Sequence, residues 1–222
     1  MKHLACFALA LAILFPSSNH AADKSADWKV LFDGKSFDGW RTYKEGGKIG
    51  AGWKIEDGVL HKLPDVPAGD LVSEKMYTDF EFSWEWKLAE KGNNGVKYFI
   101  IPERKSAVGH EYQMIDDTTV KDALSSCGSF YLVVAPKADK PMKPMGEWNQ
   151  SRIVVKCNHV EHWLNGAKVV EYECGDAKLL EQVAKTKFKS AVKFGEKVTG
   201  HILLTDHKDE CWYRNIKVRE LE

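Results

Sequence analysis

The sequence has no surplus of charge of either sign, and this limits what it can bind. Its 222 residues include 32 Lys and Arg and 32 Asp and Glu, so the formal net charge is zero. Nucleic-acid binders need a surplus of cations to neutralise phosphates, so this class is excluded. No apolar run in the sequence reaches the roughly 20 residues that a membrane-spanning helix needs. The eight Trp and seven Tyr also exclude an intrinsically disordered chain.

The short motifs of several large enzyme classes are absent as well. The sequence contains no His-Glu-x-x-His zinc motif, no Gly-x-x-x-x-Gly-Lys phosphate loop, no Gly-x-Ser-x-Gly nucleophile elbow and no Cys-x-x-Cys pair. His159, Glu161 and His162 resemble a set of metal ligands. On a strand, however, His162 points away from the other two. These motifs therefore do not predict a metal site, and the sequence does not decide whether the protein requires a metal.

The first 22 residues have the pattern of an export signal. A basic start at Lys2 is followed by an apolar stretch from Leu4 to Phe15 and by small residues at the exit, which is typical of a secretory signal peptide. We therefore expect residues 1–22 to be a signal peptide and residues 23–222 to form a single domain. The mature protein is then periplasmic or extracellular.

Export brings four cysteines into an oxidising compartment, namely Cys127, Cys157, Cys174 and Cys211. Four cysteines allow three pairings, and the sequence does not choose among them. The predicted strands place Cys157 and Cys174 at the same end of a sheet, which is compatible with a bond between them. Free buried thiols are equally compatible, so the pairing is left open.

Most of the chain has the two-residue alternation of β-strands. In Phe80–Trp86, aromatic residues occupy every second position and polar residues the others, as in a strand with one buried face. Asn165–Gly166 separates two further apolar segments and is the strongest signal for a two-residue hairpin turn. Residues 201–205 and 212–219 are expected to form a closing pair of strands.

A helical pattern is confined to residues 176–187, with Asp176 as the N-cap and Leu179, Leu180 and Val183 on one face. Many short strands with one helix predict an all-β fold, in which two antiparallel sheets pack together and one short helix is attached. In such a sandwich, an outer sheet face is free to hold a ligand.

The segment at residues 110–116 carries the most informative side chains. If it is a strand, Glu111 and Gln113 project from one face, and Tyr112 and Met114 project from the other. Two hydrogen-bonding groups then lie side by side. The ordinary alternative is a solvated sheet face without a function.

Two more predicted strands show the same alternation. Lys97 shares a face with Phe99, and His207 shares a face with Thr205. If these strands are neighbours, an amine and an imidazole join the carboxylate and the amide in one polar cluster. Sugars are bound by such mixtures of hydrogen-bonding side chains and aromatic surface.

Eight short motifs follow one another along the chain: LFDGKSFDGW at 31–40, GWKIEDGVL at 52–60, GNNGVKYF at 92–99, EYQMIDD at 111–117, GEWN at 146–149, HWLNG at 162–166, DH at 206–207 and RNI at 214–216. Each motif is weak alone, but the ordered set resembles the 3-keto-disaccharide hydrolase domain family. The resemblance covers residues 28–221. It implies a concanavalin-A-like antiparallel β-sandwich, or jelly roll.

The resemblance also implies a substrate class, namely a sugar whose C3 hydroxyl has been oxidised to a ketone by a separate oxidoreductase. The ketone acidifies the proton on C2, so a base can form an enolate that expels the C1 substituent. Water then adds at C1, which completes a net hydrolysis. Ordinary glycosidases instead place two carboxylates across the bond.

On this scheme, Glu111 or His207 is the base, and Lys97 or Arg214 stabilises the enolate oxygen. An ion pair at the sheet edge is the alternative role for Arg214. The candidate substrate contacts from the same motifs are Gln113, Asn94, Asp116, Trp163 and Thr205. The sequence identifies no certain cofactor, and a divalent metal could replace the cation at the enolate. The sequence does not indicate an oligomeric state.

Two other functions fit the same fold. A non-catalytic carbohydrate-binding module needs polar groups and an aromatic platform but no base. An exported adhesion or scaffold domain would instead present a large exposed apolar patch. Binding of unoxidised sugars without turnover of a 3-keto sugar would favour the module.

Overall fold

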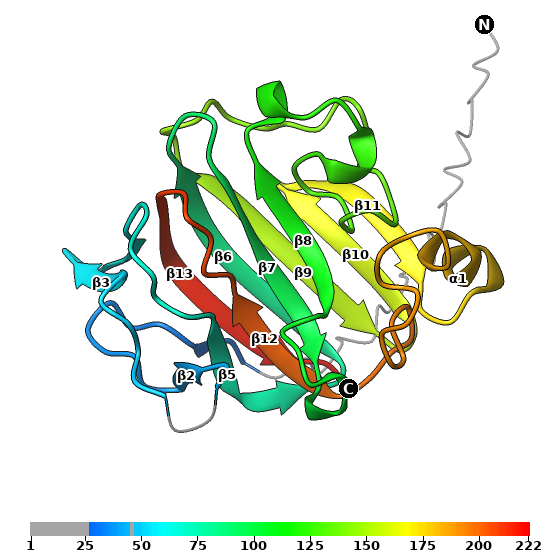
Figure 1. Cartoon of the computed structure of the whole chain (residues 1–222), viewed down its shortest axis with the longest axis horizontal. Coiled ribbons are helices and arrows are strands. Elements are labelled where there is room, and N and C mark those ends of the chain that lie inside the picture. Colours follow the sequence, from blue (N-terminus) through cyan, green and yellow to red (C-terminus); the bar gives the residue numbers. More distant parts are fainter. Residues whose placement is uncertain (1–26, 45–46) are drawn as a thin grey trace, which may run out of the picture.

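The computed structural model describes residues 27–44 and 47–222, and the predicted signal peptide at residues 1–22 lies outside them. In the described part, two antiparallel sheets stack face to face, with a five-stranded sheet in front of an eight-stranded sheet in Figure 1. None of the helices in this part is long and apolar enough to cross a membrane. The predicted all-β antiparallel sandwich is confirmed.

The strands of the eight-stranded sheet are β1 (Lys29–Val30), β3 (Trp53–Glu56), β4 (Val59–Lys62), β6 (Phe80–Leu88), β9 (Asn149–Lys156), β10 (His159–Leu164), β11 (Ala167–Glu173) and β13 (Cys211–Glu220). Their spatial order is β11, β10, β9, β6, β13, β4 and β3, and β1 pairs with β13.

The strands of the five-stranded sheet are β2 (Trp40–Thr42), β5 (Leu71–Tyr77), β7 (Asn93–Ile100), β8 (His110–Ile115) and β12 (Gly200–Leu204). Their spatial order is β2, β5, β12, β7 and β8. Three short 3-10 helices and one α-helix, α1 (Ala177–Val183), connect strands of the described part.

Large aromatic side chains fill the space between the sheets. Trp84 and Trp86 of β6 are fully buried, as are Tyr98 of β7 and Tyr112 of β8. Burying each ring contributes about 1.5–3 kcal/mol to folding. The polar atoms of these rings find partners: Trp86 Nε1 donates to Ser151 Oγ at 2.8 Å, and Tyr98 Oη lies 2.8 Å from His162 Nε2. The core is therefore aromatic and internally hydrogen-bonded.

The hairpin expected at Asn165–Gly166 is confirmed by the pairing of β10 with β11. Asn165 has φ +45° and Gly166 has φ +86°. A type I′ turn requires positive φ at both central residues, and asparagine and glycine tolerate it best. The sequence therefore specified the turn, and the pairing of the two strands then shifts register between His162 and Trp163.

The prediction that residues 201–205 and 212–219 pair with each other is wrong. The strand near residues 201–205 is β12, which lies between β5 and β7, whereas β13 lies between β6 and β4 in the other sheet. Residues 206–210 cross from one sheet to the other. The crossing is anchored where Asp206 N donates to Asp70 Oδ1 at 2.7 Å. Proximity in sequence suggested a hairpin, but each strand pairs with more distant strands.

Phe99 does not share the outer face with Lys97. Its φ is +58°, which breaks the alternation of β7. As a result, both Tyr98 and Phe99 contact Phe80 in the core. The Phe99 carbonyl accepts a 2.5 Å hydrogen bond from the Arg104 guanidinium, which supports this conformation.

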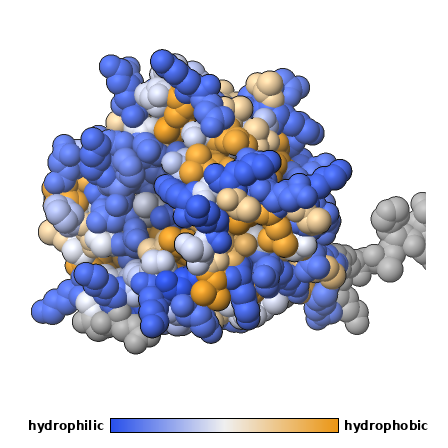
Figure 2. Space-filling model, turned by 45° about the vertical axis from the view of Figure 1, so that its right-hand side comes forward, coloured by the Kyte–Doolittle hydropathy of each residue, from blue (hydrophilic) through white to orange (hydrophobic). Residues whose placement is uncertain are grey.

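Helix α1 begins where the sequence predicted and ends earlier. The Asp176 side chain caps it by accepting hydrogen bonds from Lys178 N and Leu179 N. The helix stops at Val183 instead of reaching Lys187, and Leu180 of the predicted apolar face is 36% exposed. On the side of the molecule that carries α1, apolar and polar side chains are interspersed (Figure 2).

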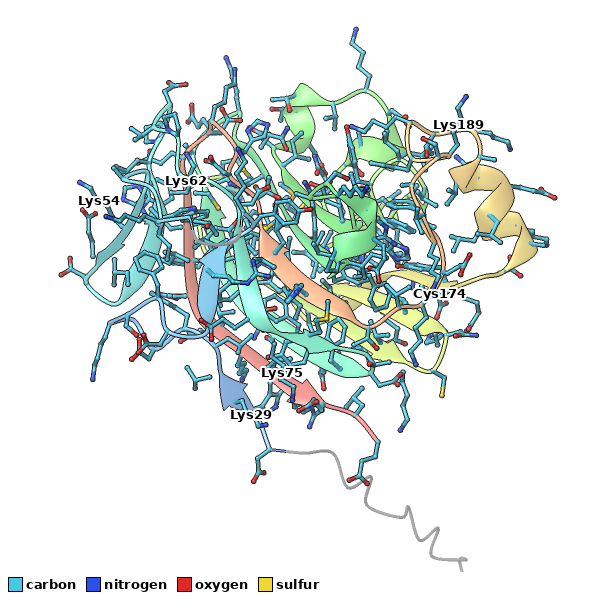
Figure 3. The ribbon with its side chains drawn as sticks, turned by 60° about the horizontal axis from the view of Figure 1, so that its bottom comes forward. Lys29, Lys54, Lys62, Lys75, Cys174 and Lys189 are labelled. Atoms are coloured by element: carbon cyan, nitrogen blue, oxygen red, sulfur yellow. The ribbon has the colours of Figure 1, made fainter. Side chains whose placement is uncertain are left out.

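The four cysteines that follow the predicted signal peptide are all free in the described part of the chain. Cys174, labelled in Figure 3, is buried at the end of β11, whereas Cys157 is exposed. Burial raises the pKa of the Cys127 and Cys174 thiols to about 12. The open question of pairing is thus answered in favour of free thiols.

Candidate active site

Four predicted or neighbouring residues form two cross-strand pairs on the outer face of the five-stranded sheet. Lys97 of β7 lies opposite Glu111 of β8, and Gly95 lies opposite Gln113. Tyr112 and Met114, between them on β8, are fully buried on the other face. The alternation predicted for residues 110–116 is therefore confirmed. Lys97 and Glu111 are half-buried.

The missing side chain of Gly95 makes room for the Glu111 carboxylate. A Cβ atom at Gly95 would lie only 2.4 Å from Glu111 Oε1. The φ of Gly95 is not in the left-handed region, so glycine is needed here for space and not for conformation. The carboxylate thus rests directly on the backbone of the neighbouring strand.

The Glu111 carboxylate has no hydrogen-bond or ion-pair partner among the described residues. Burial raises its pKa, and the charge of Asp70 adds to that effect. The positive charges of Lys97 and Lys187 act in the opposite direction. A carboxylate with a raised pKa and free oxygens is suited to accept a proton.

A chain of polar contacts runs from Gln113 to the segment that follows β12. Gln113 Nε2 donates to Asn93 Oδ1 at 3.0 Å, and Asn93 Nδ2 lies 3.5 Å from His207 Nε2. His207 Nδ1 lies 3.2 Å from Asp209 Oδ2, close enough for an ion pair with a protonated ring but not aligned as a hydrogen bond. The Gln113 amide and the His207 imidazole, which were predicted to lie in one cluster, are therefore linked through Asn93.

A buried ion pair anchors the segment that carries His207. Lys62 of β4 is 1% exposed, and its ammonium lies 3.2 Å from Asp206 Oδ1. Figure 3 labels this lysine. Asp206 Oδ2 also accepts hydrogen bonds from the backbone of Ala68 and Gly69. These contacts fix the position of the residue that precedes His207.

A surface cavity of about 380 Å³ opens beside this anchor. Asp70 and Asp206 line it, together with Tyr43 and Lys44. Asp70 is the residue whose charge helps to raise the pKa of Glu111. The cavity therefore adjoins the Glu111 face and is large enough for part of a sugar ligand.

Thr205 and Asn94 were both predicted to contact the substrate. Thr205 lies beside this face, whereas the side chain of Asn94 points away from it. Thr205 N donates to Gly95 O at 3.1 Å, and the Thr205 hydroxyl is buried without a hydrogen-bond partner among the described residues. Asn94 points into the core, where its Oδ1 accepts from Tyr213 Oη at 3.1 Å. Strand alternation turns Asn94 away because its neighbours Asn93 and Gly95 face outward. Asn94 is therefore not placed to contact a substrate on this face.

The Asp116 carboxylate is engaged within its own loop. It accepts hydrogen bonds from Thr118 N, Thr118 Oγ1 and Lys91 N. These bonds hold the pKa of Asp116 below its usual value, against the effect of burial. Asp116 thus shapes the end of β8, and its side chain is not free.

Arg214 and Trp163 lie on the outer face of the other sheet, across the core from Glu111. Arg214 of β13 forms an ion pair with Glu85 Oε2 at 2.7 Å and stacks 4.0 Å from the centre of the Trp148 ring. Trp163 of β10 stacks under Arg152 at 4.2 Å. The residues on the outer face of the five-stranded sheet, namely Glu111, Lys97, Gln113, Asn93 and His207, are called the Glu111 cluster. The prediction that Arg214 and Trp163 act at the same site as this cluster is therefore wrong. The edge ion pair considered for Arg214 is the contact observed.

Sequence reasoning missed three residues of this face, namely Gly95, Asn93 and Asp209. The run Gly92–Gly95 reads as a turn, but β7 already begins at Asn93. Asp209 accepts a hydrogen bond from Asn93 N at 3.0 Å. Extending the alternation of Lys97 back by two and four residues would have placed Gly95 and Asn93 on the face of Glu111.

One group in the described part of the chain has the geometry to hold a metal, and it lies elsewhere. His159, Glu161 and Glu171 project from the hairpin of β10 and β11. Lys168 Nζ already binds Glu161 at 3.0 Å and Glu171 at 2.5 Å. His162 points into the core, as strand alternation predicted. Sequence reasoning missed Glu171 because it comes from the partner strand.

Taken together, the face holds a free carboxylate, an amine, an amide and an imidazole. The carboxylate can remove a proton, and the amine can stabilise negative charge that develops nearby. A second carboxylate, Asp70, is near enough for its charge to act on Glu111. The arrangement is suited to proton abstraction from an acidic carbon.

Comparison with known proteins gives a consistent result. Residues 27–219 match the family described as the 3-keto-alpha-glucoside-1,2-lyase-like domain. The chain is 30% identical to a 3-keto-disaccharide hydrolase of Bacteroides thetaiotaomicron, over 87% of this chain and 78% of that protein. A solved structure from Parabacteroides distasonis, provisionally named a glycosyl hydrolase, has a TM-score of 0.77 at 31% identity and covers 88% of this chain and 94% of that one. A second from the same organism, named likewise, has a TM-score of 0.69 at 28% identity and covers 88% of this chain and 100% of that one.

These similarities extend over nearly all of the described chain. They bear out the predicted concanavalin-A-like sandwich and the predicted enzyme, and they do not favour a non-catalytic binding module. The chain is an enzyme and belongs to the 3-keto-alpha-glucoside-1,2-lyase-like domain family.

Proposed function

We propose that this enzyme cleaves the glycosidic bond of 3-keto-glycosides, including 3-keto-disaccharides, by elimination followed by hydration. The observation that carries the proposal is the unbonded Glu111 carboxylate, which lies opposite Lys97 on the outer face of the five-stranded sheet. The family and the named relative support the substrate class. The assignment of steps to residues is ours.

In the first step, Glu111 removes the proton from C2 of the sugar. The electron pair of the broken C–H bond forms a C2–C3 double bond, and the ketone oxygen becomes an enolate oxygen. Lys97 stabilises this negative charge, because a cation in a partly desolvated site interacts strongly with an oxyanion. Arg214 cannot do so, because it lies across the core on the other sheet.

In the second step, the enolate re-forms the ketone and expels the C1 substituent. His207, when protonated, donates a proton to the leaving oxygen, which departs as an alcohol. Water then adds to C1 of the unsaturated ketone, and C2 takes back a proton. Gln113 and Asn93, which are hydrogen-bonded to each other, orient the sugar hydroxyls. The net reaction consumes one water and releases a 3-keto sugar and an alcohol.

The proposed reaction must follow a reaction that another enzyme catalyses. Its substrate contains a ketone at C3, so a separate oxidoreductase must oxidise the sugar first. The pattern of residues 1–22 supports export, and we propose that the reaction takes place in the periplasm or outside the cell. A binding module would need no base held free of partners, so the observations do not favour that alternative.

The test offers the purified protein a panel of 3-keto-disaccharides and their unoxidised parents, with and without a chelator. We expect release of free sugar from the 3-keto compounds alone. In D₂O, the released 3-keto sugar should carry deuterium at C2, because that carbon loses and regains a proton. Equal turnover of the unoxidised parents, or release without deuterium at C2, would overturn the mechanism. Loss of activity with chelator would assign the enolate charge to a metal in place of Lys97.

A further inference from the structure

Two adjoining cavities lie on the outer face of the eight-stranded sheet, behind the sheet that carries Glu111 in Figure 1. Their volumes are about 370 Å³ and about 350 Å³. Ser83 of β6, Gln150 of β9 and Lys217 of β13 line both cavities. Because the two share these walls, they adjoin across three neighbouring strands, and together they are called the groove below.

The side chains at the centre of this groove have no hydrogen-bond or ion-pair partner within the described chain. They are the Ser83 hydroxyl, the Gln150 side-chain amide and the Lys217 ammonium, and the last of these lies 4.8 Å from the centre of the Trp28 ring. Ser83 is only 4% exposed, so its hydroxyl is reached through the groove. Gln150 is exposed and Lys217 is half-buried, so water or a ligand in the groove can reach all three groups. The three groups together can donate and accept hydrogen bonds.

Positive charge predominates in the first cavity. Arg152, Lys217 and Arg219 line it together with a single acid, Glu81. Glu81 is 3% exposed and is bound by both Arg152 and Arg219. The two guanidinium groups share this carboxylate, and the Lys217 ammonium in the same lining forms no ion pair among the described residues. The cavity therefore favours an anionic group.

Two indole rings complete the walls of the same cavity. Trp163 stacks with Arg152 at 4.2 Å, and Trp28 stacks with Arg219 at 4.9 Å. Gly166 leaves the rim beside Trp163 without a side chain. Indole edges and faces suit the C–H surfaces of sugar rings, whereas the serine and the amide suit hydroxyls.

The second cavity differs in charge. Asp33 and Glu85 line it with Lys217, and Glu85 is already paired with Arg214 and Asn215. This end has no excess of positive charge and offers acceptors for hydroxyl protons. A ligand along the groove would therefore place its acid near Arg152 and Lys217 and a neutral sugar near Asp33.

We propose that this groove is a second binding site, separate from the Glu111 face, that holds an oligosaccharide carrying a carboxylate or sulfate group. The site would retain the enzyme on an acidic glycan while the opposite sheet performs the reaction. The inference does not depend on the proposed reaction, because no residue of the groove belongs to the Glu111 cluster.

The test uses calorimetry with short acidic oligosaccharides, namely oligogalacturonate, oligomannuronate, hyaluronan and heparin fragments. The methyl ester of the oligogalacturonate provides a neutral ligand with the same backbone. We expect binding of at least one acidic ligand, and about tenfold weaker binding of that ligand by Lys217→Ala, since a hydrogen bond to a charged group is lost. Gln150→Ala should also weaken it. Lys189→Ala removes an exposed lysine elsewhere (Figure 3) and should bind as the unchanged protein does.

Three results would overturn the inference. They are no binding of any acidic ligand, equal binding of the oligogalacturonate and its methyl ester, and unchanged binding of the acidic ligand by both Lys217→Ala and Gln150→Ala. Cleavage of 3-keto-glycosides should be the same in Lys217→Ala as in the unchanged protein. If that cleavage is absent from both, the proposed reaction fails while the binding result still decides on the groove.

Discussion

A methyl group on Gly95 would lie 2.4 Å from Oε1 of Glu111, so the bare backbone of one residue determines where the carboxylate of the other rests. The next nearest atoms are Cδ and Cγ of the same side chain, both at 3.2 Å. The atom in conflict is therefore the far end of a flexible side chain. Rotation of Glu111 relieves the contact without moving the strands.

The substitution Gly95→Ala should therefore displace the carboxylate and leave the fold intact. We expect a loss of turnover of about a hundredfold, since a shift of about 1 Å in a catalytic group has effects of this size. Steady-state kinetics on a 3-keto-disaccharide measures the loss. The double variant Gly95→Ala with Glu111→Gln is the control. If Gly95 acts through Glu111, the double variant is no slower than Glu111→Gln alone.

The substitution Glu111→Gln should lower activity by about 10²–10⁴-fold, which is the usual contribution of a general base. It should also change the pH dependence of stability. Burial raises the pKa of Glu111 above 4.5, so its ionisation destabilises the folded state as pH rises through the folded-state pKa. Glutamine does not ionise. Urea unfolding should show the variant gaining stability relative to the parent at neutral pH, with that gain absent below pH 4.5. A gain of equal size at both pH values would contradict the assignment.

The substitutions Lys97→Ala and Arg214→Ala should have different effects, because the two cations lie on opposite outer faces of the sandwich. We expect Lys97→Ala to reduce kcat by about a hundredfold or more, as loss of an oxyanion stabiliser does. Arg214→Ala should keep its activity and lose less than about 1 kcal/mol of stability with its exposed pair to Glu85. Kinetics and urea unfolding of the two variants provide the comparison. An inactive but folded Arg214→Ala variant would show that the active site does not lie on the five-stranded sheet.

Two histidines of β10 should affect acid stability in opposite directions. Burial lowers the pKa of His162 from 6.5 to about 4, so the stability it provides is present above pH 6.5 and is lost as pH falls towards 4. The difference corresponds to about 3 kcal/mol. Buried His110 contributes in the same direction. The pKa of His159 is raised by Glu173 and Glu161 despite partial desolvation, so its stabilisation is present below pH 6.5 and is lost above its folded-state pKa.

Urea unfolding between pH 7 and pH 4.5 checks this prediction. The variant His162→Gln should lose less stability on acidification than the parent, and His159→Gln should lose more. Glutamine keeps a hydrogen-bonding group in place of the ring without a charge that titrates. Equal pH dependence of the two variants would contradict the opposite placement of the two rings.

The period-two pattern predicted the placement of side chains along single strands. It put Glu111 and Gln113 outward on β8 and turned His162 inward on β10, because alternation is a property of the strand itself. It failed at Phe99, where a positive φ breaks the pattern. Nothing in the local sequence marks this residue, whose carbonyl is held by Arg104 from the following turn.

The pattern could not give the assignment of strands to sheets. Residues 201–205 and 212–219 read as a hairpin, although a sandwich can send successive strands to different sheets. Placing both segments in one sheet led to the wrong position for Arg214. This residue follows β12 closely in sequence but lies across the core from it. Asp209 was missed for a related reason, because its contact to Asn93 joins segments far apart in the chain.

The position of β12 between β5 and β7 has a consequence for refolding. Strand β12 comes near the end of the chain, and both of its neighbours come from the first half. Pairings between distant segments require closure of large loops and form slowly. His207 follows β12 and reaches Asn93 only after that strand has docked. Recovery of catalysis after dilution from denaturant should therefore coincide with the slowest kinetic phase, later than the burial of the tryptophans of β6.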